Sequence, residues 1–187
     1  MANKKNKDKE LSIEIKLDGK VSAQLNGSTL TLEGPKGNVK KNFPDKRIKM
    51  ECKGNAIIIK ASKLNKVNKR IIKSYASHIR NMAKGALDGY KYTLKICAGH
   101  FPMSVSVSNN QLIVKNFLGE KVPRVLKLKA GTDVKVEGDI IVVEGPNKEI
   151  TGQVSASIEL LTRRTRYDTR IFQDGIWITS KDGKEIK

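Results

Sequence analysis

Hydrophobic and polar residues alternate along the first part of the chain with the two-residue period of a β-strand. Leu11, Ile13, Ile15 and Leu17 are separated by polar residues, and side chains two positions apart lie on the same face of a strand. Further apolar positions at strand spacing lie at residues 30 and 32, 39 and 43, 48 and 50, and 56–59. Glycines in the GPKG turn, residues 34–37, separate two of these stretches, so hairpins are predicted.

The spacing then changes to that of a helix. Between residues 67 and 86 the apolar positions step by four, four, four, three and four, through Val67, Ile71, Tyr75, Ile79, Met82 and Ala86. This period predicts a helix of about five turns with one buried stripe. Gly85 or Gly89 ends it, and residues 90–96 (YKYTLKI) return to strand alternation.

The second half repeats this order. Strands are predicted around residues 105–107 and 112–114, followed by the NFLGEK turn at 116–121, a return strand at 125–128 and a compact apolar strand in GDIIVVEG, residues 138–145. A helix with Ile150, Val154, Ile158 and Leu161 on one face comes next, and GIWIT, residues 175–179, closes the half.

The two halves can be aligned residue by residue. Gly37 aligns with Gly119, Asn55 with Asp139 and the pair at 88–89 with that at 174–175, so the offset grows from 82 through 84 to 86. We therefore predict an α+β fold of two tandem repeated domains, each an antiparallel sheet packed against one helix. The predicted boundaries are a basic disordered tail at 1–10, a first repeat at 11–98 and a second repeat at 99–187. The tail is either solubilising or an arm that lies on phosphates.

Charge narrows the choice of partner. The 187 residues include 37 Lys and Arg against 19 Asp and Glu, a net charge of +18, which indicates a polyanion: nucleic acid, an acidic membrane surface or an acidic protein. No stretch approaches the roughly 18 apolar residues that span a bilayer, and the amino terminus lacks the apolar core of a secretory signal. Cys52 and Cys97 provide no disulfide framework. Nucleic acid and an intracellular location are favoured.

Catalytic patterns are weak. His78 and His100 are the only histidines, and neither stands in a recognisable nucleophile–base spacing. The cysteines form no C-x-x-C pair for zinc, and the glycine turns do not supply the GxxxxGK[ST] pattern of a phosphate loop. No enzyme activity, cofactor or metal is predicted.

Arginine is concentrated just after the second predicted helix. Residues 162–170 (TRRTRYDTR) contain Arg163, Arg164, Arg166 and Arg170 around Tyr167. Guanidinium groups make paired hydrogen bonds to phosphate oxygens, and a tyrosine stacks on exposed bases. The alternative is that these cations only complement the carboxy-terminal dipole of the helix. Four arginines exceed that need, so this segment is the predicted RNA contact and the second repeat, 99–187, is the RNA-binding one.

The hairpin turns carry further cations. These are Lys36, Lys40 and Lys41 in the first repeat and Lys121 and Arg124 in the second. The first helix also has a basic side, with Lys66, Lys69, Arg70 and Lys73, which is typical of a solvated face. RNA is favoured over DNA because no helix-turn-helix pattern with a recognition helix is visible. Charged loops on a compact body also suit the shape recognition of folded RNA.

With these residues in view, the chain resembles a known family, the universal protein six of the large ribosomal subunit, called protein nine in eukaryotes. The motifs that carry the resemblance are LEGPKG at 32–37, NMAKGALDGY at 81–90, HFPM at 100–103, NFLGEK at 116–121 and YDTRIFQDGI at 167–176. NFLGEK and the closing motif are similar to the eukaryotic and archaeal branch. Gly99, Tyr167 and Gln173 depart from the residues common in the family.

The resemblance implies a non-catalytic protein that binds large-subunit ribosomal RNA and neighbouring ribosomal proteins. It further implies that the second domain lies near the sarcin–ricin loop, where translation factors dock, and that Arg170, Phe172, Asp174 and Gly175 belong to that region. The alternative hypotheses are a free RNA-binding assembly or regulatory factor and an enzyme that acts on RNA.

Overall fold

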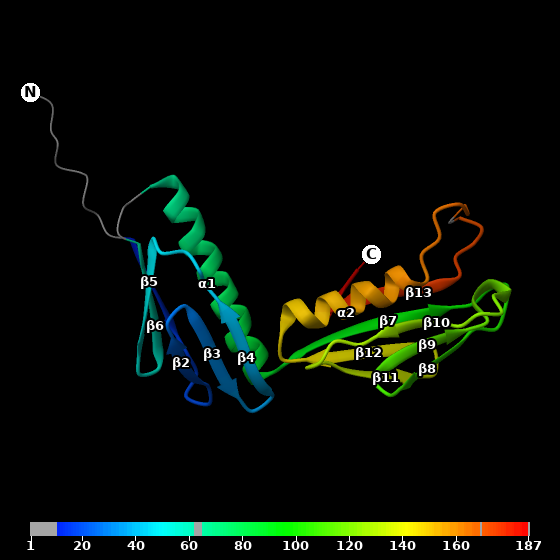
Figure 1. The fold of residues 1–187 in the computed structure, drawn as a ribbon, viewed down its shortest axis with the longest axis horizontal. Coiled ribbons are helices and arrows are strands. Elements are labelled where there is room, and N and C mark those ends of the chain that lie inside the picture. Colours follow the sequence, from blue (N-terminus) through cyan, green and yellow to red (C-terminus); the bar gives the residue numbers. More distant parts are fainter. Residues whose placement is uncertain (1–10, 62–64, 169, 187) are drawn as a thin grey trace, which may run out of the picture. The chain divides into compact units, whose positions relative to one another are not determined.

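The chain folds into two compact α+β units. The computed structural model describes residues 11–61, 65–168 and 170–186, so the predicted tail at 1–10 lies outside the described residues. Unit 1 comprises Met1–Asp88 and unit 2 comprises Gly89–Lys187. Each unit has antiparallel sheets and one long helix (Figure 1), which confirms the predicted fold class of two tandem domains.

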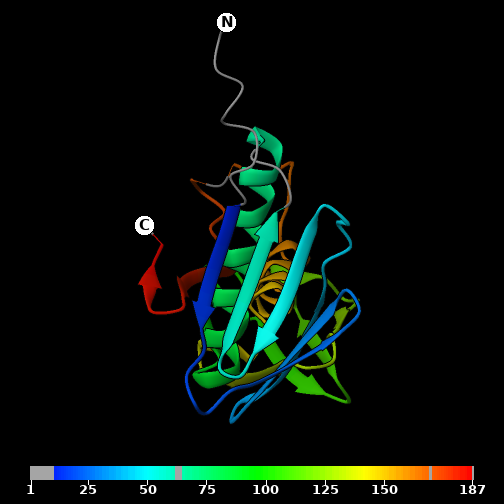
Figure 2. The ribbon, with the colours of Figure 1, turned by 90° about the vertical axis from the view of Figure 1, so that its left-hand side faces the viewer.

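Unit 1 contains two three-stranded sheets, ordered β1-β6-β5 and β2-β3-β4. Its elements are β1 (Leu11–Lys16), β2 (Ser22–Asn26), β3 (Thr29–Gly34), β4 (Gly37–Asn42), β5 (Ile48–Lys53), β6 (Ala56–Ala61) and α1 (Lys66–Leu87). β1 and β6 are paired along their length, from Leu11 opposite Ala61 to Lys16 opposite Ala56. Figure 2 shows this sheet face-on, with α1 behind it.

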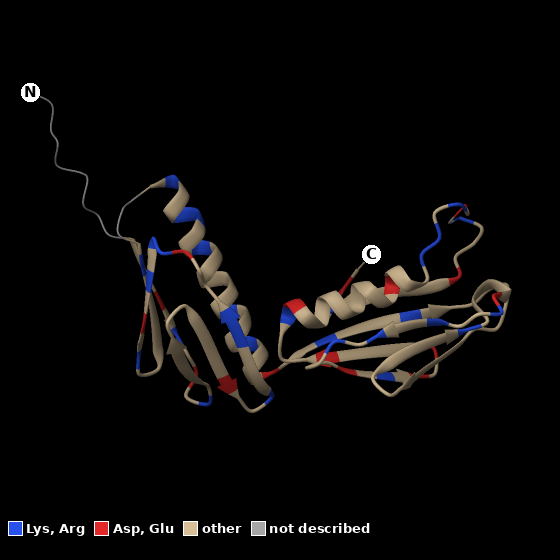
Figure 3. Ribbon diagram, viewed as in Figure 1, with Lys and Arg blue, Asp and Glu red and all other residues tan. Residues whose placement is uncertain are grey.

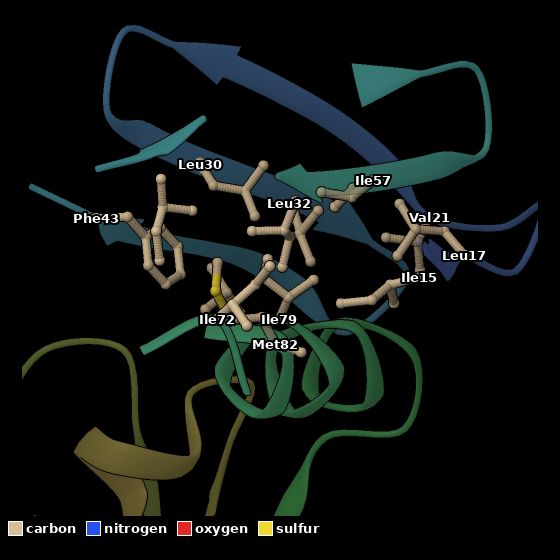
Figure 4. Close-up of a cluster of buried hydrophobic side chains, with 14 of the residues drawn as sticks. Ile15, Leu17, Val21, Leu30, Leu32, Phe43, Ile57, Ile72, Ile79 and Met82 are labelled. Atoms are coloured by element: carbon tan, nitrogen blue, oxygen red, sulfur yellow. The ribbon is translucent and has the colours of Figure 1, made fainter. Parts of the chain in front are cut away.

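The core of unit 1 lies between α1 and the strands. Leu30 and Leu32 of β3 and Ile57 of β6 are fully buried, and they face Ile72 and Ile79 of α1 (Figure 4). Burial of an aliphatic side chain contributes about 1.5–3 kcal/mol. The two sheets therefore share the helix as a common apolar partner.

The buried stripe of α1 begins one residue later than predicted. Asn68, Ile72 and Ala76 are buried, whereas Val67 is 36% exposed. The prediction placed Val67, Ile71 and Tyr75 in the stripe, but in each case the next residue along the helix is the buried one. Ile71 and Tyr75 are half-buried beside the stripe.

Unit 2 has a three-stranded sheet, β10-β9-β8, and a five-stranded sheet, β11-β12-β7-β13-β14. Its elements are β7 (Tyr90–Cys97), β8 (Ser104–Ser108), β9 (Gln111–Lys115), η1 (Phe117–Gly119), β10 (Arg124–Lys127), β11 (Asp133–Glu137), β12 (Ile140–Gly145), α2 (Lys148–Leu161), β13 (Gly175–Lys181) and β14 (Lys184–Glu185). α2 begins at a capped end: the side chain of Asn147 accepts hydrogen bonds from the backbone N–H groups of Glu149 and Ile150.

The boundary between the repeats is at Asp88–Gly89, not after residue 98 as predicted. β7 is the central strand of the unit 2 sheet, paired with β12 on one side and β13 on the other. The β7–β12 pair is thus the counterpart of β1–β6 in unit 1. A strand that follows a helix can close one repeat or open the next, and only its hydrogen-bonded partners decide between these.

The structure bears on two features that the sequence excludes, a membrane span and a disulfide framework. Within the part of the chain that the structure describes, no helix has the length and apolar character needed to cross a membrane. Cys52 and Cys97 are both free thiols, and partial burial raises the pKa of Cys52.

Candidate nucleic-acid interface

The arginine-rich segment, residues 162–170, lies between the end of α2 and the start of β13 (Figure 1). The first residue of the segment, Thr162, is held in place by two hydrogen bonds. Its hydroxyl donates to the Glu159 carbonyl at 3.2 Å and accepts from the Ile176 backbone N–H at 2.9 Å. Because Thr162 is only 4% exposed, the segment starts from a rigid point of the core and its cations are presented at a defined place.

Arg164, from this segment, packs with Phe117, Glu120 and Arg124, and we call these four residues the glutamate–arginine cluster. Arg124 makes two hydrogen bonds to Glu120, Nε to Oε2 at 2.8 Å and Nη2 to Oε1 at 2.7 Å. Arg164 also donates to Glu120. The centres of the two guanidinium groups lie 4.5 and 5.5 Å from the centroid of the Phe117 ring, within cation–π range.

The glutamate–arginine cluster also ties the segment to α2. Arg124 Nη1 donates to the Leu161 carbonyl in the last turn of the helix at 2.5 Å. The hydrogen bonds from Arg124 hold the pKa of Glu120 below its ordinary value, with smaller contributions from both positive charges. The carboxylate is therefore ionised at neutral pH and holds two arginines together.

The predicted arginines consequently fall into two sets. The side chains of Arg124 and Arg164 are only 24% exposed and are held by Glu120, so they already have partners within the protein. Arg163, Arg166 and Arg170 are exposed. Arg170 forms an ion pair with Asp168 at 3.0 Å, but its side chain remains 88% exposed. We call these three exposed residues the outer arginines, and their role as RNA contacts stays a prediction.

Tyr167 is partly engaged by its neighbours. Its ring is 42% exposed, packs edge-on against Phe172 at 4.9 Å between centroids, and has the Arg164 guanidinium 5.0 Å from its centroid. Arg163, Tyr167, Phe172 and Trp177 contribute to the wall of an open hollow of about 810 Å³. A base that stacks on Tyr167 would meet the exposed part of its ring at this hollow.

The sequence did not reveal a clamp between His100 and Asp174. Asp174 Oδ1 accepts from the backbone N–H groups of Gly99 and His100 at 2.7 and 3.0 Å, and His100 Nδ1 lies 2.6 Å from Oδ2. The His100 ring stacks on Phe172 at 4.8 Å. The clamp joins the loop after β7 to Asp174, which lies between the arginine-rich segment and β13. His100 and Asp174 are 74 positions apart in the sequence. The only sequence signal for either residue was its place in a family motif, HFPM or YDTRIFQDGI.

Two opposing influences act on Asp174. Burial of its carboxyl group would raise its pKa, but the hydrogen bonds from His100 and Gly99 outweigh this and lower the pKa below its ordinary value. The aspartate is thus a structural acceptor for two loop N–H groups. His100, the more exposed of the two catalytic candidates in the sequence, serves the same clamp.

The predicted lysines of the first repeat do not form one cluster. Lys36 is exposed in the β3–β4 turn, where its backbone N–H donates to the Ala86 carbonyl at 3.0 Å. Lys40 and Lys41 are neighbours on β4, so their side chains alternate between faces: Lys40 is exposed, and Lys41 Nζ lies 3.2 Å from His78 Nδ1 on α1. Lys121, in unit 2, is exposed beside Glu120. As RNA contacts these lysines stay predictions.

Within the residues that the structure describes, no group of three or more His, Cys, Asp or Glu side chains is placed to hold a metal ion. The surface instead carries exposed guanidinium groups next to the half-buried glutamate–arginine cluster.

Replacing Glu120 with glutamine is expected to lower the free energy of unfolding by about 1–2 kcal/mol at neutral pH, because two half-buried arginines lose their countercharge. The folded-state pKa of Glu120 is lowered, so its contribution is complete above the ordinary value of 4.5 and is lost as pH falls through the folded value. Urea denaturation at pH 7 and pH 3 would measure this, and the difference between native and variant protein should shrink at pH 3.

Glu144 is the matched control in the same unit. Its pair with Lys91 spans 3.3 Å, but the two side chains are 46% and 62% exposed. Glu144→Gln should change the free energy of unfolding by less than about 0.5 kcal/mol. An equal effect of the two substitutions would contradict a special role for the glutamate–arginine cluster.

The geometry defines a class of protein before any comparison: a basic, two-domain α+β protein with a repeated fold and exposed arginines on a rigid support. A family model described as "Ribosomal protein L6" matches the chain twice, at residues 19–89 and 101–175, once in each unit. The chain belongs to this ribosomal protein L6 family. The family is structural and non-enzymatic.

Curated relatives agree along nearly the whole chain. The "Large ribosomal subunit protein uL6" of Methanosarcina mazei is 41% identical over 173 residues, which cover 92% of this chain and 98% of the relative. The protein of the same name from Methanococcus vannielii is 42% identical, with 92% and 95% covered, and that from Saccharolobus solfataricus 41% identical, with 90% and 94% covered. These relatives are archaeal, which confirms the resemblance drawn from NFLGEK and the closing motif.

Proposed function

We propose that this protein is a structural constituent of the large ribosomal subunit that binds ribosomal RNA, bound to ribosomes in the cytoplasm. The observation that carries the proposal is the 41–42% identity to large-subunit proteins over more than nine-tenths of this chain and of each relative. The net charge of +18 and the outer arginines support it, because phosphate neutralisation and counterion release supply most of the affinity of such proteins for RNA.

Within the subunit, we assign the RNA contact of unit 2 to Arg163, Arg166 and Arg170, with Tyr167 beside them. Their side chains are exposed on a segment that Thr162, the glutamate–arginine cluster and the Asp174 clamp hold in place. A rigid support lowers the entropy lost when arginines bind. The target is the sarcin–ricin loop region near the factor-docking site, with other ribosomal proteins as neighbours.

Substituting glutamine for all three outer arginines is expected to weaken binding to deproteinised large-subunit RNA and to reduce the slope of log K against log salt by about 2–3, because each phosphate contact contributes close to one unit. Arg164 is left unchanged because it supports the fold. Filter binding over a range of KCl concentrations measures both quantities, and chemical probing of the RNA shows whether protection at the sarcin–ricin loop is lost.

A charge-matched control in the same unit is Lys127→Gln, Lys181→Gln, Lys184→Gln. These lysines are exposed, on β10, β13 and β14, and the same net charge is removed. The control should keep most of the native slope and the native protection pattern. If both triple variants lose affinity equally, the contact is not at the outer arginines.

A free RNA-binding assembly or regulatory factor is the alternative function. Sedimentation separates the two: a structural constituent remains with large subunits after a high-salt wash, whereas a factor is released. Release of the protein together with non-ribosomal RNA would favour the alternative.

A further inference from the structure

We propose that the outward side of α1, in unit 1, is a second RNA-binding surface that contacts phosphates independently of the outer arginines. The surface is the α1 stripe, defined as Lys66, Lys69, Arg70, Lys73 and Arg80. All five side chains are exposed, and Figure 3 shows basic positions recurring along this helix. The inference rests on the proposed function only in taking the same RNA as the partner.

The α1 stripe is a single continuous band. At 3.6 residues per turn its five members fall within about 100° of the helix circumference, on the side away from the buried Ile72 and Ile79. At 1.5 Å per residue, Lys66 and Arg80 lie about 21 Å apart along the axis. A band of this length reaches several successive phosphates of an RNA strand.

Among the residues whose structure is described, no acidic side chain balances the charges of this band. The sequence of α1, KVNKRIIKSYASHIRNMAKGAL, contains no acidic residue. None of the five side chains forms an ion pair with any residue in the described ranges. Lys66 and Arg70, and Lys69 and Lys73, are like charges four residues apart, a spacing that destabilises a helix.

The amino-terminal end of α1 adds a second unfavourable feature. The helix begins at Asn65 without a side-chain cap and without an acidic residue in its first turn, where Lys66 and Lys69 lie instead. Cations there oppose the helix dipole, whose positive end is the amino terminus. The isolated protein therefore holds cations where an ordinary solvated helix places acids.

The repeat provides an internal comparison. α2 is the equivalent helix of unit 2, and it has a side-chain cap from Asn147, an acidic first turn with Glu149, and a single basic residue, Lys148. Figure 3 shows acidic positions on α2, whereas the charged positions along α1 are basic. Because the two helices have the same place in a repeated fold, the fold does not require the positive charge of α1. That charge suits a polyanionic partner.

RNA fits the α1 stripe better than an acidic protein does. Protein interfaces are enriched in aromatic residues and depleted in lysine, whereas this band has three lysines among five cations and Val67, at 36% exposed, as its neighbouring apolar residue. Point-like ammonium groups along a rigid rod are suited to a phosphate backbone rather than to a packed apolar patch.

The test neutralises part of the stripe in the full chain, with Lys69→Gln, Lys73→Gln and Arg80→Gln together. The control removes the same charge from exposed strand lysines of unit 1, Lys16→Gln, Lys49→Gln and Lys53→Gln. The probe is deproteinised large-subunit RNA over a range of KCl concentrations. We expect the stripe variant to lose about 2–3 from the slope of log K against log salt, and the control to lose less than about 1.

Thermal denaturation of the free protein provides a second readout. The stripe variant should melt at the same temperature as the native protein or up to a few degrees higher, because like-charge repulsion and the opposition to the helix dipole are relieved. If the stripe were only structural, its loss would lower the melting temperature and leave the salt slope unchanged, and that pair of results would overturn the proposal.

The remaining outcomes are also decisive. Equal loss of slope in stripe and control variants would mean that charge acts without a defined site, which overturns the proposal. An unchanged slope, with the stripe lysines protected from acetylation in assembled subunits, would assign the band to a protein neighbour. If only the outer-arginine variant loses affinity, the proposed function stands and this inference fails. If the native protein does not bind the RNA at all, both fail.

Discussion

Phe117→Ala is expected to lower the free energy of unfolding of unit 2 by about 3–5 kcal/mol, the range for removing a large aromatic side chain from a packed core. Phe117 is 2% exposed. It packs in the same core cluster as Leu94, Ile141 and Ile158, and its outer face receives both guanidinium groups of the glutamate–arginine cluster. Truncation leaves a cavity and removes the support of Arg124 and Arg164.

The single tryptophan of the chain, Trp177, lies on β13 of unit 2, so its fluorescence during urea denaturation reports this unit. Phe117→Leu separates the contribution of core packing from that of the cation–π contacts, because leucine keeps most of the apolar volume and removes the aromatic face. Any loss of unfolding free energy beyond the packing change, about 0.5–1 kcal/mol, then measures the cation–π contacts. RNA affinity of the folded Phe117→Ala protein should also fall, because the segment that carries the outer arginines loses its support.

Phe101→Ala is the matched control. Phe101 belongs to the same unit and is 48% exposed, so its removal should cost less than about 1 kcal/mol. If the two alanine variants unfold at the same urea concentration, Phe117 does not have the central role that its burial indicates.

Gly34→Ala is expected to lower the free energy of unfolding of unit 1 by about 3 kcal/mol, the upper part of the usual range for overpacking. A Cβ at this position would lie 2.4 Å from the carbonyl oxygen and 2.8 Å from the carbonyl carbon of Ala86 in α1. Both are backbone atoms, so no side chain can rotate away, and β3 must separate from the end of the helix. The hydrogen bond from the Lys36 N–H to the same carbonyl would be strained or lost.

The measurement for Gly34→Ala is hydrogen exchange or circular dichroism during denaturation, with Trp177 fluorescence as the reporter of unaffected unit 2. Gly19→Ala is the control, since its added Cβ would meet only the side chain of Asn55 at an ordinary 3.7 Å. Gly19→Ala should change the free energy of unfolding by no more than about 0.5 kcal/mol. A Gly34→Ala protein as stable as Gly19→Ala would show that β3 and α1 are not in contact at this point.

The structural features behind these expected effects differ in how well the sequence predicts them. The two helices and most strands follow from local periodicity, and the order of turns and apolar runs identifies the repeat. β2, β11 and β14 were not predicted, because short strands with few large apolar residues have little signal of their own. The closing motif at 167–176 marked Asp174, but nothing local indicated that it would bind the loop at Gly99 and His100.

The arginines show most clearly what the sequence alone cannot predict. In sequence Arg163, Arg164 and Arg166 are equivalent, three guanidinium groups in four residues. Their roles diverge because the chain turn after Thr162 directs Arg164 toward Glu120, 44 residues earlier, and leaves its neighbours exposed. A contact between residues so distant in sequence depends on how the sheet and helix pack, and composition carries no information about it.

The sequence by itself determined the α+β class, the duplication, the family and the excess of positive charge, because helical period, strand alternation and net charge are properties of short segments or of the whole composition. Only the tertiary structure decided that β7 opens the second unit, which arginines support the fold and which remain exposed, and that the cations of α1 form one band. Each of these depends on strand pairing or side-chain packing between segments that are distant in the chain.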